Sequence, residues 1–272
     1  MRPTGKSDRN AGSTPGKVDY SVVCTDVNDY VDWQCELLEY SWNDVGQSGE
    51  LLRLVTCPPS QRLPRSRHAR VIRIADKSDR TGGYLAFERL FALQDWLSRD
   101  RPDGSVLILD PDCVFRAPVT NGAEPGRPRA THWLELPDHR GVQPATWPAI
   151  IHTRDLERLL PSWISFTRAI FSSTGRWESD MYALVSAAAS LGLRFSLEQI
   201  SAFVRWPDSA CRDAPIVHYA HDTYASDDRL IWSKRTYEPW SAVERADAAK
   251  HDYCRDLLRI LNTYARERRS KP

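Results

Sequence analysis

Residues 105–116, SVLILDPDCVFR, combine a short apolar run with a pair of acids. The run covers residues 106–109 and is bounded by Gly104 and Asp110. Four consecutive apolar residues predict a strand buried on both faces, as in a parallel sheet. The strand ends in Asp110-Pro111-Asp112, and carboxylates of this kind make poor core residues. The stretch therefore predicts an α/β fold with an acidic site at the carboxyl end of one strand.

The Asp-x-Asp pair has the chemistry of a cation site. Mg²⁺ and Mn²⁺ prefer hard oxygen ligands, typically one or two carboxylates plus substrate phosphates. Ligands of open α/β sheets bind at the carboxyl ends of the strands. We therefore interpret Asp110 and Asp112 as metal ligands in a nucleotide-sugar site. The alternative is a structural turn or helix cap, where such pairs are also common.

The composition is that of an ordinary folded protein. The 272 residues, 41% hydrophobic and 27% charged, suit one large α/β domain or two small ones. A net charge of +1 gives no support for a nucleic-acid or anionic-membrane partner. No stretch approaches the roughly 20 apolar residues of a membrane span, and residues 1–17 lack the apolar segment of a secretory signal. We therefore expect a cytoplasmic protein.

The six cysteines form no CxxC pair, and several lie inside apolar segments. This pattern predicts buried thiols in a reducing compartment, not a disulfide framework or a zinc site. The cysteines are Cys24, Cys35, Cys57, Cys113, Cys211 and Cys254.

Strands and helices alternate through the first half of the chain. This order predicts a central, mostly parallel sheet flanked by helices, with right-handed crossovers. We expect strands at residues 18–24, 51–57, 69–75, 105–109, 130–136, 149–152 and 215–219. We expect helices at residues 28–45, 84–97, 154–172, 177–191 and 242–268, the third kinked or restarted at Pro161.

The chain divides into three parts in this interpretation. Residues 1–17 are polar and predict a disordered tail. Residues 18–240 form the domain, and residues 241–272 form a helix packed on it.

The first strand ends in Cys24-Thr25-Asp26. In a doubly wound sheet this loop contacts the base and ribose of a nucleotide, and a carboxylate accepts ribose hydroxyls. We therefore predict that Thr25 and Asp26 contact a nucleotide. The alternative, that Asp26 or Asn28 only caps the next helix, stays open. The chain has neither GxGxxG nor GxxxxGK[ST], which argues against a dinucleotide fold or a P-loop kinase.

Three basic residues are candidates for phosphate contacts. Lys77 follows the third strand, and Lys234 and Arg235 follow Trp232. Lys77 suits a phosphate, and the adjacent pair suits a diphosphate. The alternative for all three is a solvated surface cation.

Asp180 and His218 complete the candidate set. Asp180 falls in the first turn of the helix at 177–191, where the helix dipole favours an acid in any case. Its functional interpretation is a carboxylate that faces the donor sugar or the acceptor hydroxyl. His218 ends a short strand and would add a nitrogen ligand for Mn²⁺ to the two aspartates. A hydrogen-bonded structural histidine is the alternative.

A series of motifs runs in order through residues 20–240. They include YVDWQC at 30–35, a strand at 51–57, LILDPDCVFRAP at 107–118, GRP at 126–128, AIIH at 149–152, RWESDMYA at 176–183, WP at 206–207, HY at 218–219 and WSKRTY at 232–237.

This ordered series resembles the plant hydroxyproline O-arabinosyltransferases and the related peptidyl-serine α-galactosyltransferases. The set is much more specific than any one of its motifs. One departure is Asp180, which stands where the plant proteins have Glu. The shorter chain without a signal anchor suggests a bacterial member with a different acceptor.

The resemblance implies a GT-A-like, Rossmann-like glycosyltransferase domain over residues 18–240. It implies transfer of arabinose or galactose, with retention, from a UDP-sugar to hydroxyproline or serine in a peptide, or to a small-molecule hydroxyl. Asp110, Asp112 and His218 would hold Mn²⁺ or Mg²⁺, while Lys234 or Arg235 would assist the diphosphate. Asp180 would lie near the anomeric carbon, as nucleophile or as the group that orients the acceptor.

Two other functions use the same features. One is a non-catalytic carbohydrate- or peptide-binding module on a decayed transferase fold, against which the intact Asp-x-Asp pair, Asp180 and His218 argue. The other is a sugar nucleotidyltransferase, which has a related α/β sheet. Such enzymes normally carry a Gly-rich, Arg/Lys-bearing loop after the first strand, where this chain has CTDVND.

Overall fold

The computed structural model describes residues 16–75, 84, 86–133, 143–203 and 206–270. The described residues form a seven-stranded sheet in which four of the six neighbouring pairs are parallel. The prediction of a mostly parallel central sheet is therefore confirmed. In sheet order the strands are β3 (Ala69–Ile74), β2 (Glu50–Thr56), β1 (Tyr20–Thr25), β4 (Ser105–Leu109), β7 (Ala145–His152), β6 (Arg129–His132) and β8 (Ser196–Glu198).

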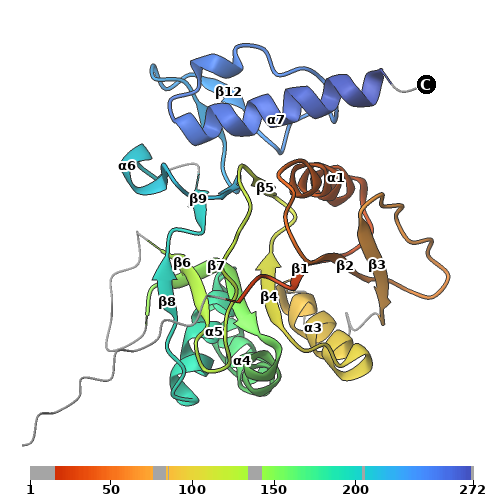
Figure 1. Ribbon diagram of the computed structural model, residues 1–272, viewed down its shortest axis with the longest axis vertical. Helices are drawn as coiled ribbons and strands as arrows, with labels where there is room; N and C mark the ends of the chain where they lie inside the picture. The colour runs from red at the N-terminus through yellow and green to blue at the C-terminus, as the bar shows by residue number, and fades with distance from the viewer. Residues whose placement is uncertain (1–15, 76–83, 85, 134–142, 204–205, 271–272) are drawn as a thin grey trace, which may run out of the picture.

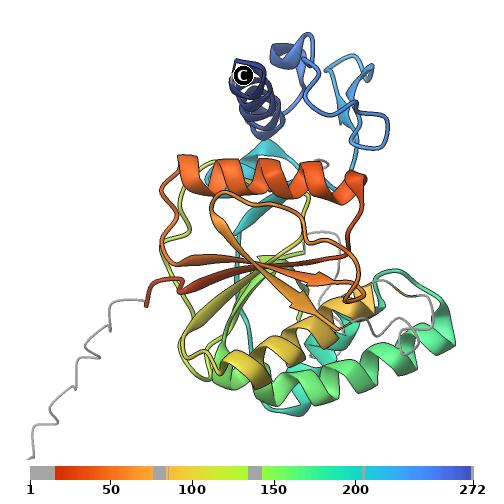
Figure 2. The ribbon, with the colours of Figure 1, turned by 90° about the vertical axis from the view of Figure 1, so that its right-hand side faces the viewer.

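Helices cover both faces of this sheet (Figures 1 and 2). One face carries α1 (Asp29–Asp44), and the other carries α3 (Ala86–Asp100), α4 (Thr153–Thr174) and α5 (Ser179–Ser190). Strand β4 is buried between them: Val106 and Ile108 join the core on the α3–α5 side, and Leu107 joins the core on the α1 side. The predicted double burial of this strand is confirmed.

Gly104 sets the start of β4. Its φ of 145° disfavours any other residue, and a Cβ there would lie 2.5 Å from Asp19 Oδ2. The same Asp19 oxygen accepts a hydrogen bond from the Ser105 N–H at 2.9 Å. This close approach therefore holds the beginning of β4 against Asp19, the residue that precedes β1.

Strand β7 is longer than the predicted strand at 149–152. It begins at Ala145 and contains Pro148, although it lies between β4 and β6. The β6–β7 pairing shifts register between Ala130 and Thr131, and Thr131 Oγ1 donates to the Pro148 carbonyl at 3.0 Å. This bulge removes the need for a ladder hydrogen bond from the proline nitrogen, which is why the strand continues through it.

Helix α4 runs continuously through Pro161 from Thr153 to Thr174, so the helix does not restart there, and a kink at Pro161 stays a prediction. One further helix prediction needs correction. The last helix, α7 (Asp252–Arg269), begins later than residue 242, after the short 3₁₀ helix η1 (Ala246–Ala248). It lies against α1, with the rings of Tyr40 and Tyr264 4.6 Å apart and an Arg268–Glu36 ion pair.

All six cysteines are free, and five of them are buried. Burial raises the pKa of the Cys24 and Cys35 thiols to about 12, so both stay protonated near neutral pH. The prediction of buried thiols is confirmed for five of the six, while Cys24 is only partly buried.

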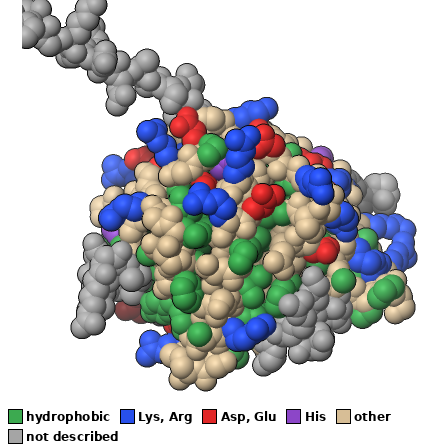
Figure 3. Space-filling model, turned by 90° about the horizontal axis from the view of Figure 1, so that it is seen from below, with side chains coloured by type: hydrophobic (Ala, Val, Ile, Leu, Met, Phe, Trp, Pro, Cys, Tyr) green, Lys and Arg blue, Asp and Glu red, His purple; other side chains and the backbone are tan. Residues whose placement is uncertain are grey.

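Few large apolar side chains of the described residues are exposed: Tyr30, Trp177, Tyr224 and Leu230. Figure 3 shows one face of the molecule, on which hydrophobic side chains lie among Lys and Arg side chains. No helix in the described part of the chain is both long and apolar enough to cross a membrane. Residues 1–15 of the predicted tail lie outside the described residues.

Ile108→Ala should lower the free energy of unfolding by about 2–5 kcal/mol, because it leaves a cavity between β4 and its helices. Urea denaturation measures the loss. Leu230→Ala is the control, since Leu230 is 51% exposed and should change stability by less than about 0.5 kcal/mol. Equal effects of the two substitutions would contradict the central position of β4.

Candidate active site

The turn after β4 leads into a second, three-stranded sheet. Strand β5 (Cys113–Phe115) pairs antiparallel with β10 (Ile216–His218), which pairs with β9 (Ser201–Phe203). The register sets His218 opposite Cys113, and the Tyr219 N–H donates to the Asp112 carbonyl at 2.9 Å. This pairing brings a histidine from late in the chain beside the Asp-x-Asp turn.

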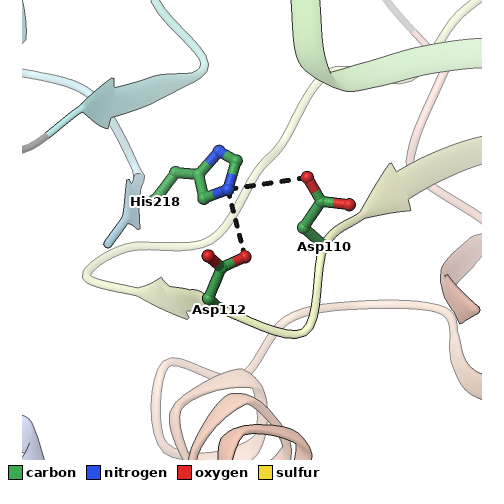
Figure 4. A group of neighbouring side chains, drawn as sticks. All are labelled: Asp110, Asp112 and His218. Carbon is green, nitrogen blue, oxygen red and sulfur yellow. Dashed lines mark ion pairs between the residues drawn. The ribbon is translucent and has the colours of Figure 1, made fainter. Parts of the chain in front are cut away.

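Asp110, Asp112 and His218 point toward one another (Figure 4). His218 Nε2 lies 3.1 Å from Asp112 Oδ1 and 3.5 Å from Asp110 Oδ2. One ligand atom from each residue lies within 4.8 Å of the others. The three predicted metal ligands are therefore brought together.

The second oxygen of each carboxylate is held by a protein cation. Arg89 of α3 pairs with Asp110 Oδ1, and Lys234 pairs with Asp112 Oδ2. Lys234 follows β12 (Leu230–Trp232), which pairs with β11 (Thr223–Tyr224). The aspartates thus direct one oxygen to a cation and the other toward His218. Lys234 contacts a predicted metal ligand directly, a contact that the sequence did not predict.

These contacts shift the ionisation of the cluster. Burial raises the pKa of Asp112, but His218 and Lys234 outweigh that effect and hold the pKa well below its usual range. Burial alone would lower the pKa of His218, and the facing carboxylates of Asp112 and Asp110 raise it instead. Asp112 is therefore a carboxylate at neutral pH, the form in which it ligates a cation.

Asp180 lies in the first turn of α5 with its side chain only 5% exposed. Its Oδ2 is 3.3 Å from Arg89 Nη1, and its Oδ1 is 2.9 Å from the Tyr84 hydroxyl. The Trp163 indole N–H donates to the Asp180 carbonyl at 2.7 Å. Burial raises the pKa of the Asp180 carboxyl, and the Arg89 guanidinium offsets part of that rise. Arg89 therefore bridges Asp110 of the cluster and Asp180.

The sequence interpretation missed Arg89 and Tyr84. Arg89 lies on the apolar stripe of α3, with Leu93 and Trp96 four and seven residues later. A single arginine within such a stripe is a signal that a buried acid lies opposite, although it does not identify that acid.

A cavity of about 600 Å³ opens onto these groups, a volume typical of ligand sites. Its lining includes six of the nine predicted site residues: Asp110, Asp112, Asp180, His218, Lys234 and Arg235. Aromatic side chains form much of the rest: Trp133, Trp147, Trp177, Phe203 and Trp206.

The predicted nucleotide contacts lie elsewhere. Thr25 Oγ1 accepts a hydrogen bond from Arg53 at 3.0 Å, and Asp26 accepts one from the Asn28 side chain at 2.6 Å. Asn28 is the cap of α1, because its Oδ1 accepts from the Val31 N–H at 2.8 Å. Among the described residues, the cavity lining does not include Thr25 or Asp26. Lys77 lies outside the described residues.

The donor set fits a hard divalent cation. Two carboxylate oxygens and an imidazole nitrogen suit Mn²⁺ or Mg²⁺ when substrate oxygens complete the shell. Ligating histidines usually donate their second ring N–H to a neighbour. His218 Nδ1 is buried and has no hydrogen-bond partner in the part of the chain that the structure describes, so this usual support is missing.

The chain is distantly similar to named plant glycosyltransferases, while no family model matches it. It is 27% identical over 223 residues to the peptidyl serine alpha-galactosyltransferase of Arabidopsis thaliana. It is 26% identical over 261 residues to the hydroxyproline O-arabinosyltransferase NOD3 of Pisum sativum, and 26% identical over 245 residues to the hydroxyproline O-arabinosyltransferase 3 of Arabidopsis thaliana.

The share of each relative that the alignment covers differs. The alignment with the galactosyltransferase covers 65% of this chain but only 26% of that protein. The alignments with the two arabinosyltransferases cover 83% and 78% of this chain, and 74% and 67% of those proteins. The similarity therefore extends over most of this chain, and over only about a quarter of the first relative.

Asp112→Asn should weaken Mn²⁺ binding by more than ~100-fold, because it removes a residue that contacts the ion. Loss of a residue that only hydrogen-bonds to a metal ligand typically weakens metal affinity by ~10–100-fold. Calorimetric titration with MnCl₂ measures the affinity. Asp227→Asn is the matched control, since Asp227 is exposed and does not line the cavity. Unchanged Mn²⁺ affinity in a folded Asp112→Asn protein would contradict the metal assignment.

Arg89→Met should lower the free energy of unfolding by about 3–5 kcal/mol, because it leaves the buried Asp180 carboxylate and the half-buried Asp110 carboxylate without their shared cation. Adding Asp180→Asn to Arg89→Met should restore part of that loss by removing one of those charges. Denaturant titration of the two single variants and the double variant measures the coupling. Strictly additive effects would show that Arg89 and Asp180 do not interact.

Proposed function

We propose that this chain is a metal-dependent glycosyltransferase that moves arabinose or galactose from a UDP-sugar to a hydroxyl of hydroxyproline or serine in a peptide. The observation that carries the proposal is the convergence of Asp110, Asp112 and His218 on a cavity that Asp180 also lines. The distant relatives, which are named for transfer of galactose to peptidyl serine and of arabinose to hydroxyproline, support the reaction class and the acceptor.

The cluster would serve the departing diphosphate. Asp110, Asp112 and His218 would hold Mn²⁺ or Mg²⁺, which neutralises negative charge on that group. Lys234 would keep the Asp112 carboxylate in place. Arg235 is the more available cation for a phosphate, because it lines the cavity and its side chain is 64% exposed.

Thr25 and Asp26 would contact the nucleoside, as residues at the end of β1 do in related sheets. Lys77 remains a predicted phosphate contact. The contacts of Thr25 with Arg53 and of Asp26 with Asn28 would have to rearrange or be shared when the nucleotide binds.

Asp180 would act at the anomeric carbon, with retention of configuration. In one route the Asp180 carboxylate attacks that carbon as its bond to the diphosphate breaks and UDP leaves, and the acceptor hydroxyl then displaces Asp180 and gives its proton to the departed diphosphate. In the other route Asp180 orients the acceptor hydroxyl, which attacks the carbon as UDP leaves from the same face and takes the proton on its phosphate. The burial of Asp180 and its contacts with Arg89 and Tyr84 would hold the carboxylate in one orientation for either route.

A thermal-shift screen of UDP- and GDP-sugars, with and without Mn²⁺, tests which nucleotide sugar binds and whether its binding requires the metal. A ligand that binds the native state raises its melting temperature, so the proposal predicts a Mn²⁺-dependent shift with UDP-sugars. Turnover of a nucleoside triphosphate plus a sugar phosphate would instead indicate a nucleotidyltransferase. Carbohydrate binding without donor cleavage would indicate a binding module.

Asp180→Asn should lower the transfer rate by at least about a hundredfold and leave UDP-sugar affinity unchanged, since Asp180 would act on the sugar carbon and not on the nucleotide. Radiolabelled sugar transfer measures the rate, and calorimetry measures donor affinity. Asp227→Asn again provides the control. Loss of donor affinity together with the rate would make Asp180 a donor-binding residue.

A further inference from the structure

Two kinds of side chain line the cavity. The ends of β4 and β10, together with the segment after β12, contribute charged groups that include Asp112, His218 and Arg235. The lining also includes Trp177 and Glu178, which directly precede α5, and Met181 in the first turn of α5. The charged groups suit an anionic diphosphate and a cation, whereas an aromatic face suits an uncharged ring of a ligand.

Trp177 differs from the other aromatic residues that line the cavity. Trp147 is stacked on Trp163 with centroids 5.4 Å apart, and Phe203 packs on Trp206 at 4.5 Å. Trp177 is 67% exposed, the most exposed large apolar side chain of the described residues. In the described part of the chain, no ring contact involves its indole. A single exposed apolar residue needs no explanation by itself, but this one lines the cavity.

The backbone of Trp177 is fixed to the candidate catalytic carboxylate. The Tyr84 hydroxyl lies within hydrogen-bond distance of the Trp177 carbonyl and 2.9 Å from Asp180 Oδ1, and it accepts from the Asp180 N–H at 3.1 Å. The Tyr84 ring is in turn stacked on Phe171 at 4.3 Å. One buried phenol therefore ties the position of the exposed indole to the position of Asp180.

We infer that Trp177 is the acceptor platform, on which the pyrrolidine ring of a proline- or hydroxyproline-containing peptide stacks so that its hydroxyl faces Asp180. This inference rests on the proposed function for the direction in which the hydroxyl points. Aromatic grooves bind proline-rich segments because the extended helix of such segments is preformed and presents flat rings. Glu178, the neighbour of Trp177 in the sequence, and Asp180 also line the cavity, and both disfavour an anionic ligand beside Trp177.

Calorimetric titration with a short hydroxyproline-rich peptide tests the inference without requiring turnover. Trp177→Ala should bind the peptide at least about tenfold more weakly than the wild type, a loss of about 1.4 kcal/mol. Trp177→Phe should keep most of the affinity, since it keeps an aromatic face. Leu230→Ala, which changes an exposed apolar residue outside the cavity lining, should bind like the wild type. A peptide with every imino acid replaced by alanine should bind weakly to all four proteins.

Unchanged peptide affinity in Trp177→Ala would overturn the inference, and so would equal binding of the alanine peptide by the wild type. Absence of peptide binding by the wild type would overturn it as well. A Mn²⁺-dependent thermal shift with UDP, measured on the same four proteins, reports on the donor separately. Failure of that shift would count against the proposed function, whereas peptide affinities alone decide the role of Trp177.

Discussion

Asp112 is buried and Asp110 is half-buried at the end of β4, and the charge of both carboxylates has to be balanced there. An unbalanced buried carboxylate costs several kcal/mol. Arg89 and Lys234 each hold one oxygen, and the remaining oxygens face His218. Because α3, the segment after β12 and β10 supply these partners, the acidic turn requires three separate parts of the chain to meet at one point.

The same requirement links the acidic turn to α5. Arg89 touches Asp180 as well as Asp110, so the charge of the cluster and the charge on α5 depend on one guanidinium. Tyr84 then connects Asp180 to the exposed Trp177. A divalent cation that took over Asp110 would change the electrostatic environment of Asp180 through Arg89. Arg89 and Tyr84 therefore connect Asp110, Asp180 and Trp177 in one chain of contacts.

Local patterns were enough to predict β4, its Asp-x-Asp turn and the cap of α1 at Asn28, because each depends on neighbouring residues only. The ordered motifs also made His218 a candidate beside the turn. Arg89 was not predictable, since its partners meet it only after α3 and α5 pack on the same face of the sheet. The predicted length of β7 was too short, because the bulge that accommodates Pro148 forms only where β7 pairs with β6. Contacts between distant parts of the chain, and not local sequence preference, determine both the partners of Arg89 and the length of β7.

The most direct measurement is pulsed electron paramagnetic resonance of Mn²⁺ bound to the protein, before and after UDP is added. Asp110, Asp112 and His218 as ligands predict a nitrogen coupling from one imidazole that disappears in His218→Gln. They also predict a phosphorus coupling to the same ion when UDP is present. A Mn²⁺ spectrum without the nitrogen coupling, or with a nitrogen coupling unchanged in His218→Gln, would contradict the assignment of the site.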